Sequence, residues 1–248
     1  MKTIPRFSIA SRVAHWALAA PFLLLLASGL LLFVPSVKSQ HVGGYRIVPL
    51  FHVALGIAFL AGPALVWLAA PGRTALRADL GRLFRVAPGD GAWLRYAGYA
   101  LLGAGVRPPP VGKFNAGQKL NTVATLGFTL GLMLSGAVLA VNYFTKAVFS
   151  SGFVEAVYPL HDAFMAIALP LVAGHIYLST LNPGTRASLR GMLDGHVDLA
   201  WARRHHPLWA DEAAGNRHPA SGDGEPGTSS AEAAADNSPP ATGQRPNS

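Results

Sequence analysis

Two histidines lie in one long apolar segment, residues 158–183, and their spacing suits a pair of metal-binding groups. His161 and His175 are 14 positions apart. In an α-helix, 14 steps of about 100° return to within about 40° of the starting direction, and at about 1.5 Å per residue they cover about 21 Å. The segment is long enough to cross the roughly 30 Å hydrocarbon core of a bilayer. One helix therefore presents two imidazoles on nearly one face, one toward each side of a membrane.

Histidine buried in a membrane is costly and usually marks a functional site. His15 and His52 lie near the starts of two other apolar runs. Two imidazoles at two depths of one helix suggest two stacked haems, for which other helices supply the second axial ligands. The chain has no cysteine, which excludes disulfides, cysteine-ligated iron–sulfur clusters and covalent C-x-x-C-H haem attachment. Any haem is therefore held without a covalent bond.

The composition indicates a membrane protein. Of the 248 residues, 51% are hydrophobic and only 13% are charged, whereas soluble domains carry about 25% charged residues. The formal charge of +8 raises nucleic-acid binding as a first interpretation. The arginines, however, lie beside apolar runs, which fits a role in membrane topology. We therefore expect the chain to contact membrane lipid and not nucleic acid.

Four transmembrane spans are predicted, at about 13–34, 47–70, 120–141 and 158–181. The first is longer than the 7–15 apolar residues of a secretory signal, so we expect it to be retained. The connection 71–119 is expected to form one or two surface helices. Residues 1–210 then make a four-span domain, and residues 211–248, which have few apolar side chains, a disordered cytoplasmic tail.

Basic residues orient these spans. They concentrate in the N-terminus, in the 71–119 connection and after the fourth span, whereas the other two connections hold only Lys38, Arg46 and Lys146. Because cytoplasmic loops are enriched in Lys and Arg, both termini are predicted to be cytoplasmic, in a multi-pass protein of the bacterial inner membrane.

This topology sorts the four histidines into two pairs by depth. His15 and His175 lie near the cytoplasm, and His52 and His161 near the outside. The predicted fold class is an all-α membrane protein, a four-helix transmembrane bundle that binds two b-type haems with bis-histidine ligation. Gly29, 14 positions after His15, would face the other haem and leave room for its porphyrin.

Other interpretations of the histidines remain open. A single histidine near a helix end is often an interfacial residue, and proton relays or transporters also use membrane histidines. Relays usually include buried carboxylates, and the nearest candidates, Asp162 and Glu155, lie at the outer edge. The remaining histidines are expected to be solvated or interfacial, with His205 and His206 meeting lipid headgroups or a partner subunit: His41, His196, His205, His206 and His218.

Several segments resemble the di-haem cytochrome b subunits of membrane respiratory dehydrogenases, in particular the gamma subunit, cytochrome b556, of formate dehydrogenase. They are RVAHW at 12–16, GKFNAGQK at 112–119, the helix that carries His161 and His175, and GHVDLAWARRHHPLW at 195–209. GKFNAGQK and WARRHHPLW are the more specific. The resemblance covers about residues 6–210.

The resemblance implies an electron-transfer subunit without a formate active site of its own. Its partners would be an iron–sulfur beta subunit and a catalytic molybdenum or tungsten alpha subunit. Electrons would pass from the outer haem (His52, His161) to the inner haem (His15, His175) and on to menaquinone or ubiquinone. In the family the quinone site adjoins the inner haem, which corresponds here to His175 and Asn115, with Gly117 and Gln118 as weaker candidates.

Two residues near the inner haem have competing roles. Asn115 can donate a hydrogen bond to a quinone carbonyl, but Asn115 and Gln118 can also cap the start of a helix. Arg12, one turn before His15, can pair with a haem propionate, or it can act only as one of the basic residues that orient the first span. The alternatives for the whole chain are the cytochrome b of a hydrogenase or another molybdoenzyme and, from a different class, a membrane transporter that uses the same histidines.

Overall fold

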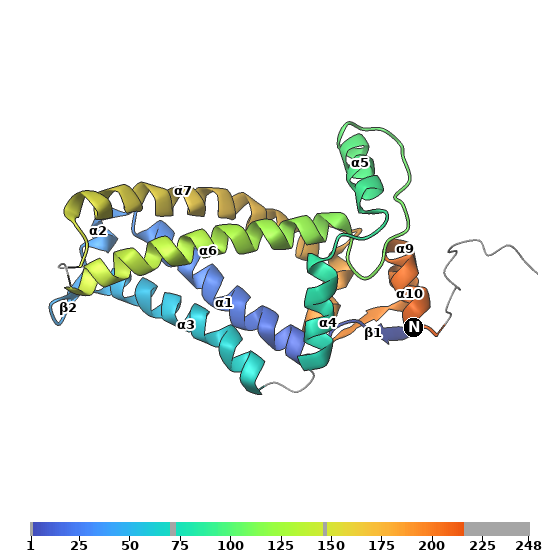
Figure 1. Ribbon diagram of the computed structural model, residues 1–248, viewed down its shortest axis with the longest axis horizontal. Coiled ribbons are helices and arrows are strands. Elements are labelled where there is room, and N and C mark those ends of the chain that lie inside the picture. The colour runs from blue at the N-terminus through green and yellow to red at the C-terminus, as the bar shows by residue number, and fades with distance from the viewer. Residues whose placement is uncertain (1, 70–72, 146–147, 216–248) are drawn as a thin grey trace, which may run out of the picture. The chain divides into compact units, whose positions relative to one another are not determined.

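The computed structural model describes residues 2–69, 73–145 and 148–215. Four of its helices are long and apolar enough to cross a membrane. They are α1 (Ile9–Leu31), α3 (Ile47–Ala69), α6 (Ala116–Thr145) and α7 (Ser151–Ile176), which continues as a π-helical turn, η1 (Tyr177–Leu181). Figure 1 shows these four helices running alongside one another, and α1 packs mainly on α3 while α6 packs mainly on α7.

Helices α1, α6 and α7 begin before the spans predicted from hydropathy, at Ile9, Ala116 and Ser151, whereas α3 begins at Ile47 as predicted. Ser8 caps α1 by accepting a hydrogen bond from the Ser11 backbone N–H, at 3.1 Å. Ser150 caps α7 in the same way, from the Phe153 backbone N–H. Such polar caps satisfy the first free N–H groups of a helix. They place the helix starts several residues before the apolar part that a hydropathy window detects.

The side chains of the spans face outward to an unusual extent for a folded protein. Leucines such as Leu60, Leu68 and Leu134 are 60%, 71% and 63% exposed. In water, so large an apolar surface would drive association. Around membrane-spanning helices it is the surface that lipid covers.

Short elements connect the spans. Between α1 and α3 lie α2 (Pro35–Lys38) and a hairpin of β2 (His41–Val42) and β3 (Tyr45–Arg46). Its two-residue turn is Gly43-Gly44, both with positive φ, a geometry that glycine adopts without strain. The described part of the connection between α3 and α6, residues 73–115, holds two helices, α4 (Arg73–Phe84) and α5 (Asp90–Leu101).

The two ends of the described chain form what we call the terminal cap, residues 2–8 and 186–213. Strand β1 (Thr3–Pro5) pairs antiparallel with β4 (His196–Asp198). The cap also contains η2 (Arg186–Ser188), α8 (Leu189–Leu193), α9 (Leu199–His205) and α10 (Pro207–Ala213). Its buried apolar side chains form a small core of their own: Ile4, Val197, Leu199, Trp201, Ala202, Trp209 and Ala210.

Two sequence-based expectations are wrong in the cap. His206 is only 3% exposed, where we expected a solvated or interfacial residue, because the cap closes over it. The predicted disordered tail begins at 211, yet helix α10 continues to Ala213. The rest of the tail prediction, with His218, falls on 216–248, outside the described residues.

Candidate haem site

The four histidines of the spans lie in two close pairs. The rings of His15 on α1 and His175 on α7 have centroids 6.3 Å apart, with an interplanar angle of 61°. The rings of His52 on α3 and His161 on α7 have centroids 6.4 Å apart, at 80°. We call these the inner and the outer pair, after the predicted topology. Helix α7 thus contributes one imidazole to each pair.

The separation within each pair suits one metal ion between two imidazoles. An imidazole nitrogen binds a transition metal at about 2 Å and lies about 1 Å from the ring centre, so two such ligands on opposite sides place their centroids about 6 Å apart. Both observed separations agree with this value. The residues present therefore fit bis-histidine ligation at two levels, although their role as ligands stays a prediction.

Serines orient both imidazoles of the outer pair. Ser28 Oγ lies 2.8 Å from His52 Nδ1, and Ser135 Oγ lies 2.8 Å from His161 Nδ1. Each hydroxyl also lies within hydrogen-bond distance of a carbonyl of its own helix, Leu24 O for Ser28 and Gly131 O for Ser135. The single hydroxyl hydrogen goes to the carbonyl, so the serine oxygen accepts from the Nδ1–H of the histidine. This tautomer leaves Nε2 free to bind a metal, as is usual for metal-binding histidines, whose other ring N–H donates to a nearby acceptor.

A glycine follows each of these serines and lies against the same ring. A Cβ on Gly29 would stand 3.5 Å from His52 Cε1, an ordinary contact, whereas one on Gly136 would stand 3.2 Å from His161 Cε1. Gly29 thus lies beside the outer pair, at the depth expected for it. The Ser-Gly dipeptide that recurs in the first and third spans, at 28–29 and 135–136, is the sequence signal that could have identified Ser28, Ser135 and Gly136 as functional positions.

The inner pair has a different environment. Among the described residues, no side-chain hydrogen bond reaches the imidazole of His15 or His175. Their neighbours on α1 are bound instead to the terminal cap, where Arg12 Nη1 donates to Leu193 O at 2.7 Å and Trp16 Nε1 donates to Met192 O at 3.1 Å. A groove of about 490 Å³ lies here, lined by Arg12, Val13, Trp16, Ala17, Met192 and Leu193.

One N–H of the Arg12 guanidinium is without an acceptor in the described part of the chain. Its Nε is buried and has no hydrogen-bond partner among the described residues. A buried, unpartnered guanidinium N–H is destabilising unless an acceptor binds it. A haem propionate one turn from His15 would supply that acceptor, so the observation fits the role expected for Arg12.

Asn115 and Gln118 form a reciprocal cap at the start of α6. The Gln118 backbone N–H donates to Asn115 Oδ1 at 2.9 Å, and the Asn115 backbone N–H donates to Gln118 Oε1 at 3.0 Å. Both side-chain oxygens are therefore engaged, as in a capping box. The amide –NH₂ group of Asn115 takes no part in this cap and remains a donor, so capping and quinone binding are compatible.

Gly117 has a packing role in this structure. A Cβ there would lie 2.5 Å from the indole of Trp93 on α5, which leaves no room for any side chain. The glycine permits α5 to pack on the start of α6. This accounts for Gly117 without a ligand, while its place in a quinone site remains a prediction.

Comparison with known proteins assigns the family. Residues 6–195 match the prokaryotic cytochrome b561 family, which is well over half of the chain. The chain belongs to this family. Membership implies b-type haem, and with the four apolar helices it makes the chain a multi-pass protein of the prokaryotic inner membrane.

Curated relatives narrow the comparison. The cytochrome b556(fdo) subunit of formate dehydrogenase from Escherichia coli K12 is 29% identical over 213 residues, covering 85% of this chain and 93% of the relative. The cytochrome b556(Fdn) subunit of its nitrate-inducible formate dehydrogenase is 26% identical over 213 residues, at 85% and 92% coverage. The Haemophilus influenzae cytochrome b556 subunit is 26% identical over 217 residues, at 84% and 83% coverage. The resemblance to formate dehydrogenase cytochrome b556 subunits is thereby confirmed.

Proposed function

We propose that this b561-family cytochrome is the membrane subunit of a respiratory formate dehydrogenase. In this proposal a molybdenum or tungsten alpha subunit passes electrons to an iron–sulfur beta subunit outside the membrane. The present chain takes the electrons from the beta subunit and reduces quinone near the cytoplasmic side. The names of its relatives support the complex. A transporter, the alternative from another class, gains no support from membership in a cytochrome family.

The two histidine pairs carry the proposal. Each pair has the ring separation that one iron needs, and the 14-residue spacing on α7 sets the two levels about 21 Å apart along the helix. A bound haem with two histidine ligands stores one electron reversibly and has no open position for oxygen. The chain provides the imidazoles, and at the outer level the serines that orient them.

The charge distribution supports the orientation of the bundle. The N-terminus and the segment after α7 adjoin the span ends that carry the inner pair, and the third basic region, the 71–119 connection, contacts the same end of α1 through Asp79 and Ser11. The connections at the opposite ends of the spans hold only three Lys and Arg residues. Under the positive-inside rule the inner pair then lies toward the cytoplasm and both termini are cytoplasmic. Electrons would enter at the outer pair and leave at the inner pair.

The quinone site in this proposal lies beside the inner pair and includes His175, Asn115 and Gln118, with Gly117 shaping the turn. The free –NH₂ of Asn115 is the donor for a quinone carbonyl. Reducing a quinone to a quinol takes two electrons and two protons. Electrons that arrive from outside and protons that arrive from the cytoplasm would together generate membrane potential.

Substrate-driven reduction of the haem tests the function. Formate added to the complex purified through this chain should reduce the haem, and a menaquinone or ubiquinone analogue should reoxidise it. Reduction by hydrogen and not by formate would instead assign the chain to a hydrogenase. A quinone-site inhibitor that binds on the outer side would contradict the proposed sidedness.

A further inference from the structure

The last part of the loop before α6, residues 111–114, is held by other parts of the chain. In residues 111–114 the carbonyls of Val111, Gly112 and Lys113 all accept hydrogen bonds from the terminal cap. The ring of Phe114 lies 6.1 Å from that of Phe7. Asn115, which begins the helix cap described above, follows directly. The position of Asn115 is therefore tied to the N- and C-terminal segments, which are remote in sequence.

Arg6 is the centre of these contacts. It is 3% exposed, and its guanidinium lies over the rings of Phe7, Trp201 and Trp209 at 5.1–5.4 Å. Nη2 donates to Lys113 O at 3.4 Å and to His206 Nε2 at 3.1 Å. Burial lowers the pKa of Arg6 to about 10, so it stays charged at neutral pH. Cation–π contact with three rings compensates in part for its desolvation.

The contacts of His206 fix its tautomer. A guanidinium can only donate, so Nε2 of His206 accepts from Arg6 and its hydrogen is on Nδ1. Nδ1 lies 2.9 Å from Gly112 O and donates to it. Burial and the charge of Arg6 lower the pKa of His206 to about 3, so the ring stays neutral and keeps both bonds. Arg6 and His206 thus form a chain of hydrogen bonds that ends on the loop.

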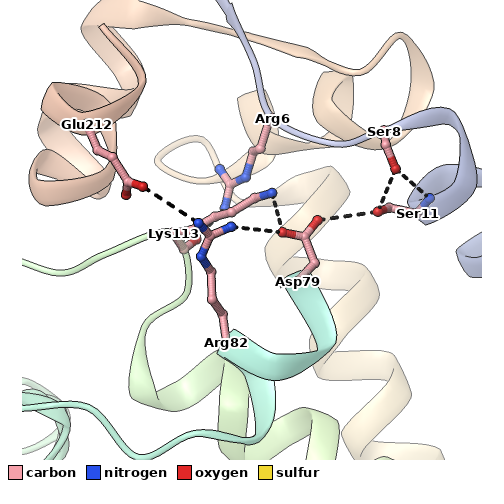
Figure 2. A network of polar contacts seen from close by, with 7 residues as sticks. All are labelled: Arg6, Ser8, Ser11, Asp79, Arg82, Lys113 and Glu212. Carbon is pink, nitrogen blue, oxygen red and sulfur yellow. Dashed lines mark hydrogen bonds and ion pairs between the residues drawn. The ribbon is translucent and has the colours of Figure 1, made fainter. Parts of the chain in front are cut away.

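A buried ion pair also holds this loop. Lys113 Nζ lies 2.5 Å from Asp79 Oδ1 of α4, and both side chains are less than 10% exposed. Asp79 also accepts from Ser11 Oγ of α1 at 3.3 Å. Figure 2 shows Asp79 between Lys113, Ser11 and Arg82, with Arg82 reaching on to Glu212 of the cap. Ser11 lies one helical turn before His15, so one network joins the loop to the helix of the inner pair.

We propose that Arg6 and His206 are positioning residues for quinone binding: they hold residues 111–114 so that the amide of Asn115 faces the quinone. This inference rests on the proposed function and goes beyond it, since both residues act through the loop and contact no ligand. The competing role is purely structural, in which they stabilise the cap alone. A structural role alone would leave the affinity for quinone unchanged wherever the protein folds with its haem.

The test uses the full chain in its complex, with three variants: His206→Gln, Arg6→Lys and, as matched control, His205→Gln. His205 stacks on Trp201 and bonds its carbonyl but makes none of the loop contacts. Haem content and formate-driven haem reduction report on the fold and on electron entry. Hydrogen exchange of residues 108–119 reports on the loop, and KM and kcat for a short-tailed quinone analogue report on the site.

We expect His206→Gln and Arg6→Lys to keep their haem, to exchange faster in residues 108–119 and to raise KM about tenfold or more, with a smaller change in kcat. His205→Gln should match the wild type. An unchanged KM, with or without faster exchange, would overturn the positioning role. Loss of haem in both variants would overturn it as well, because the residues would then maintain the bundle. A wild-type complex whose haem no quinone reoxidises would instead refute the proposed function.

Discussion

The outer and inner histidine pairs have nearly the same ring separation but are held by different parts of the chain. Each outer imidazole is fixed by a serine and flanked by a glycine from the neighbouring span, through Ser28-Gly29 and Ser135-Gly136. Around the inner pair, the contacts come from outside the spans. Arg12 and Trp16 bond to carbonyls of the terminal cap, and Ser11 bonds to Asp79 of α4.

The outer site is thus formed almost entirely by the membrane spans, whereas the inner site also depends on the segments that connect them. The outer site repeats one arrangement in two helix pairs, α1 with α3 and α6 with α7, so it needs little besides the spans. Near the inner pair lie a groove, an Arg12 N–H that has no acceptor within the described part of the chain, and a loop held by the cap. We infer that the outer level suits passage of electrons alone and the inner level suits exchange with a ligand.

The largest expected effect is loss of one haem when one ligand is removed. His161→Ala should leave about half of the haem, because the partner imidazole cannot supply both axial bonds, and His175→Ala should lose the other half. Pyridine haemochrome quantification per chain measures both. Loss of all haem in His161→Ala alone would show that the inner site depends on the outer one and would break the comparison.

Asn115→Ala should impair quinone reduction at the inner pair without affecting electron entry at the outer pair. We expect both haems to remain and kcat/KM for quinone to fall roughly tenfold to a hundredfold, as for one lost hydrogen bond to a buried polar group. Formate-driven haem reduction is the control and should not change. An unaltered kcat/KM would mean that Asn115 only caps α6.

The two outer glycines should differ in their response to alanine. Gly136→Ala places a Cβ 3.2 Å from His161 Cε1 and must shift that ring, whereas Gly29→Ala makes an ordinary contact at 3.5 Å with His52. We expect both variants to lower the occupancy of the outer haem, since Gly29 is expected to leave room for the porphyrin, and Gly136→Ala to lower it further because it also displaces the ring of His161. Haem content and the low-spin EPR signal of the outer haem measure this. Equal effects would show that the two halves of the outer site are equivalent.

Acid should loosen the inner end before the outer one. The pKa of His206 is about 3 because of burial and the neighbouring Arg6, against about 6.5 in an unfolded chain. As the pH falls from about 6.5 toward 3, the unfolded state gains a proton that the folded state does not, so stability falls by about 1.4 kcal/mol per pH unit. Above pH 6.5 the effect vanishes. Exchange protection factors of residues 195–213 should drop at pH 5.5, and His206→Gln should remove that drop.

The smallest effect concerns the outer haem potential. An Nδ1–H bond to serine makes the imidazole a stronger ligand, which favours the oxidised iron. Ser28→Ala or Ser135→Ala should therefore raise the outer potential by roughly 20–60 mV, the equivalent of about 1 kcal/mol, and leave the inner potential unchanged. Redox titration with optical detection resolves the two. A shift of the inner potential instead would contradict the assignment of the serines to the outer level.

The sequence alone was sufficient for the spans and for which histidines meet. The pairing depends on regular helix geometry and on charge. The 14-residue spacing of His161 and His175 sets two depths on α7, and the arginine distribution predicts the direction in which each span crosses the membrane. These expectations needed no knowledge of side-chain packing, and the structure brings the predicted partners together.

The sequence did not predict the contacts that orient those histidines. A serine inside an apolar helix ordinarily donates a hydrogen bond to a backbone carbonyl of the same helix. Neither Ser28 nor Ser135, taken alone, therefore indicated a contact with a histidine. The burial of His206 was missed because a His-His pair in a basic stretch is typical of solvated surface. Its burial depends on pairing between strand β1 and strand β4, nearly 200 residues apart, which local patterns do not report.

Haem counting on the purified full-length protein tests the central claim most directly. A dithionite-reduced minus oxidised spectrum, combined with haem and protein quantification, should give two b-type haems per chain, both low-spin. One haem per chain would contradict the pairing of four histidines into two sites. No haem, in protein produced with sufficient haem supply, would contradict the electron-transfer function itself.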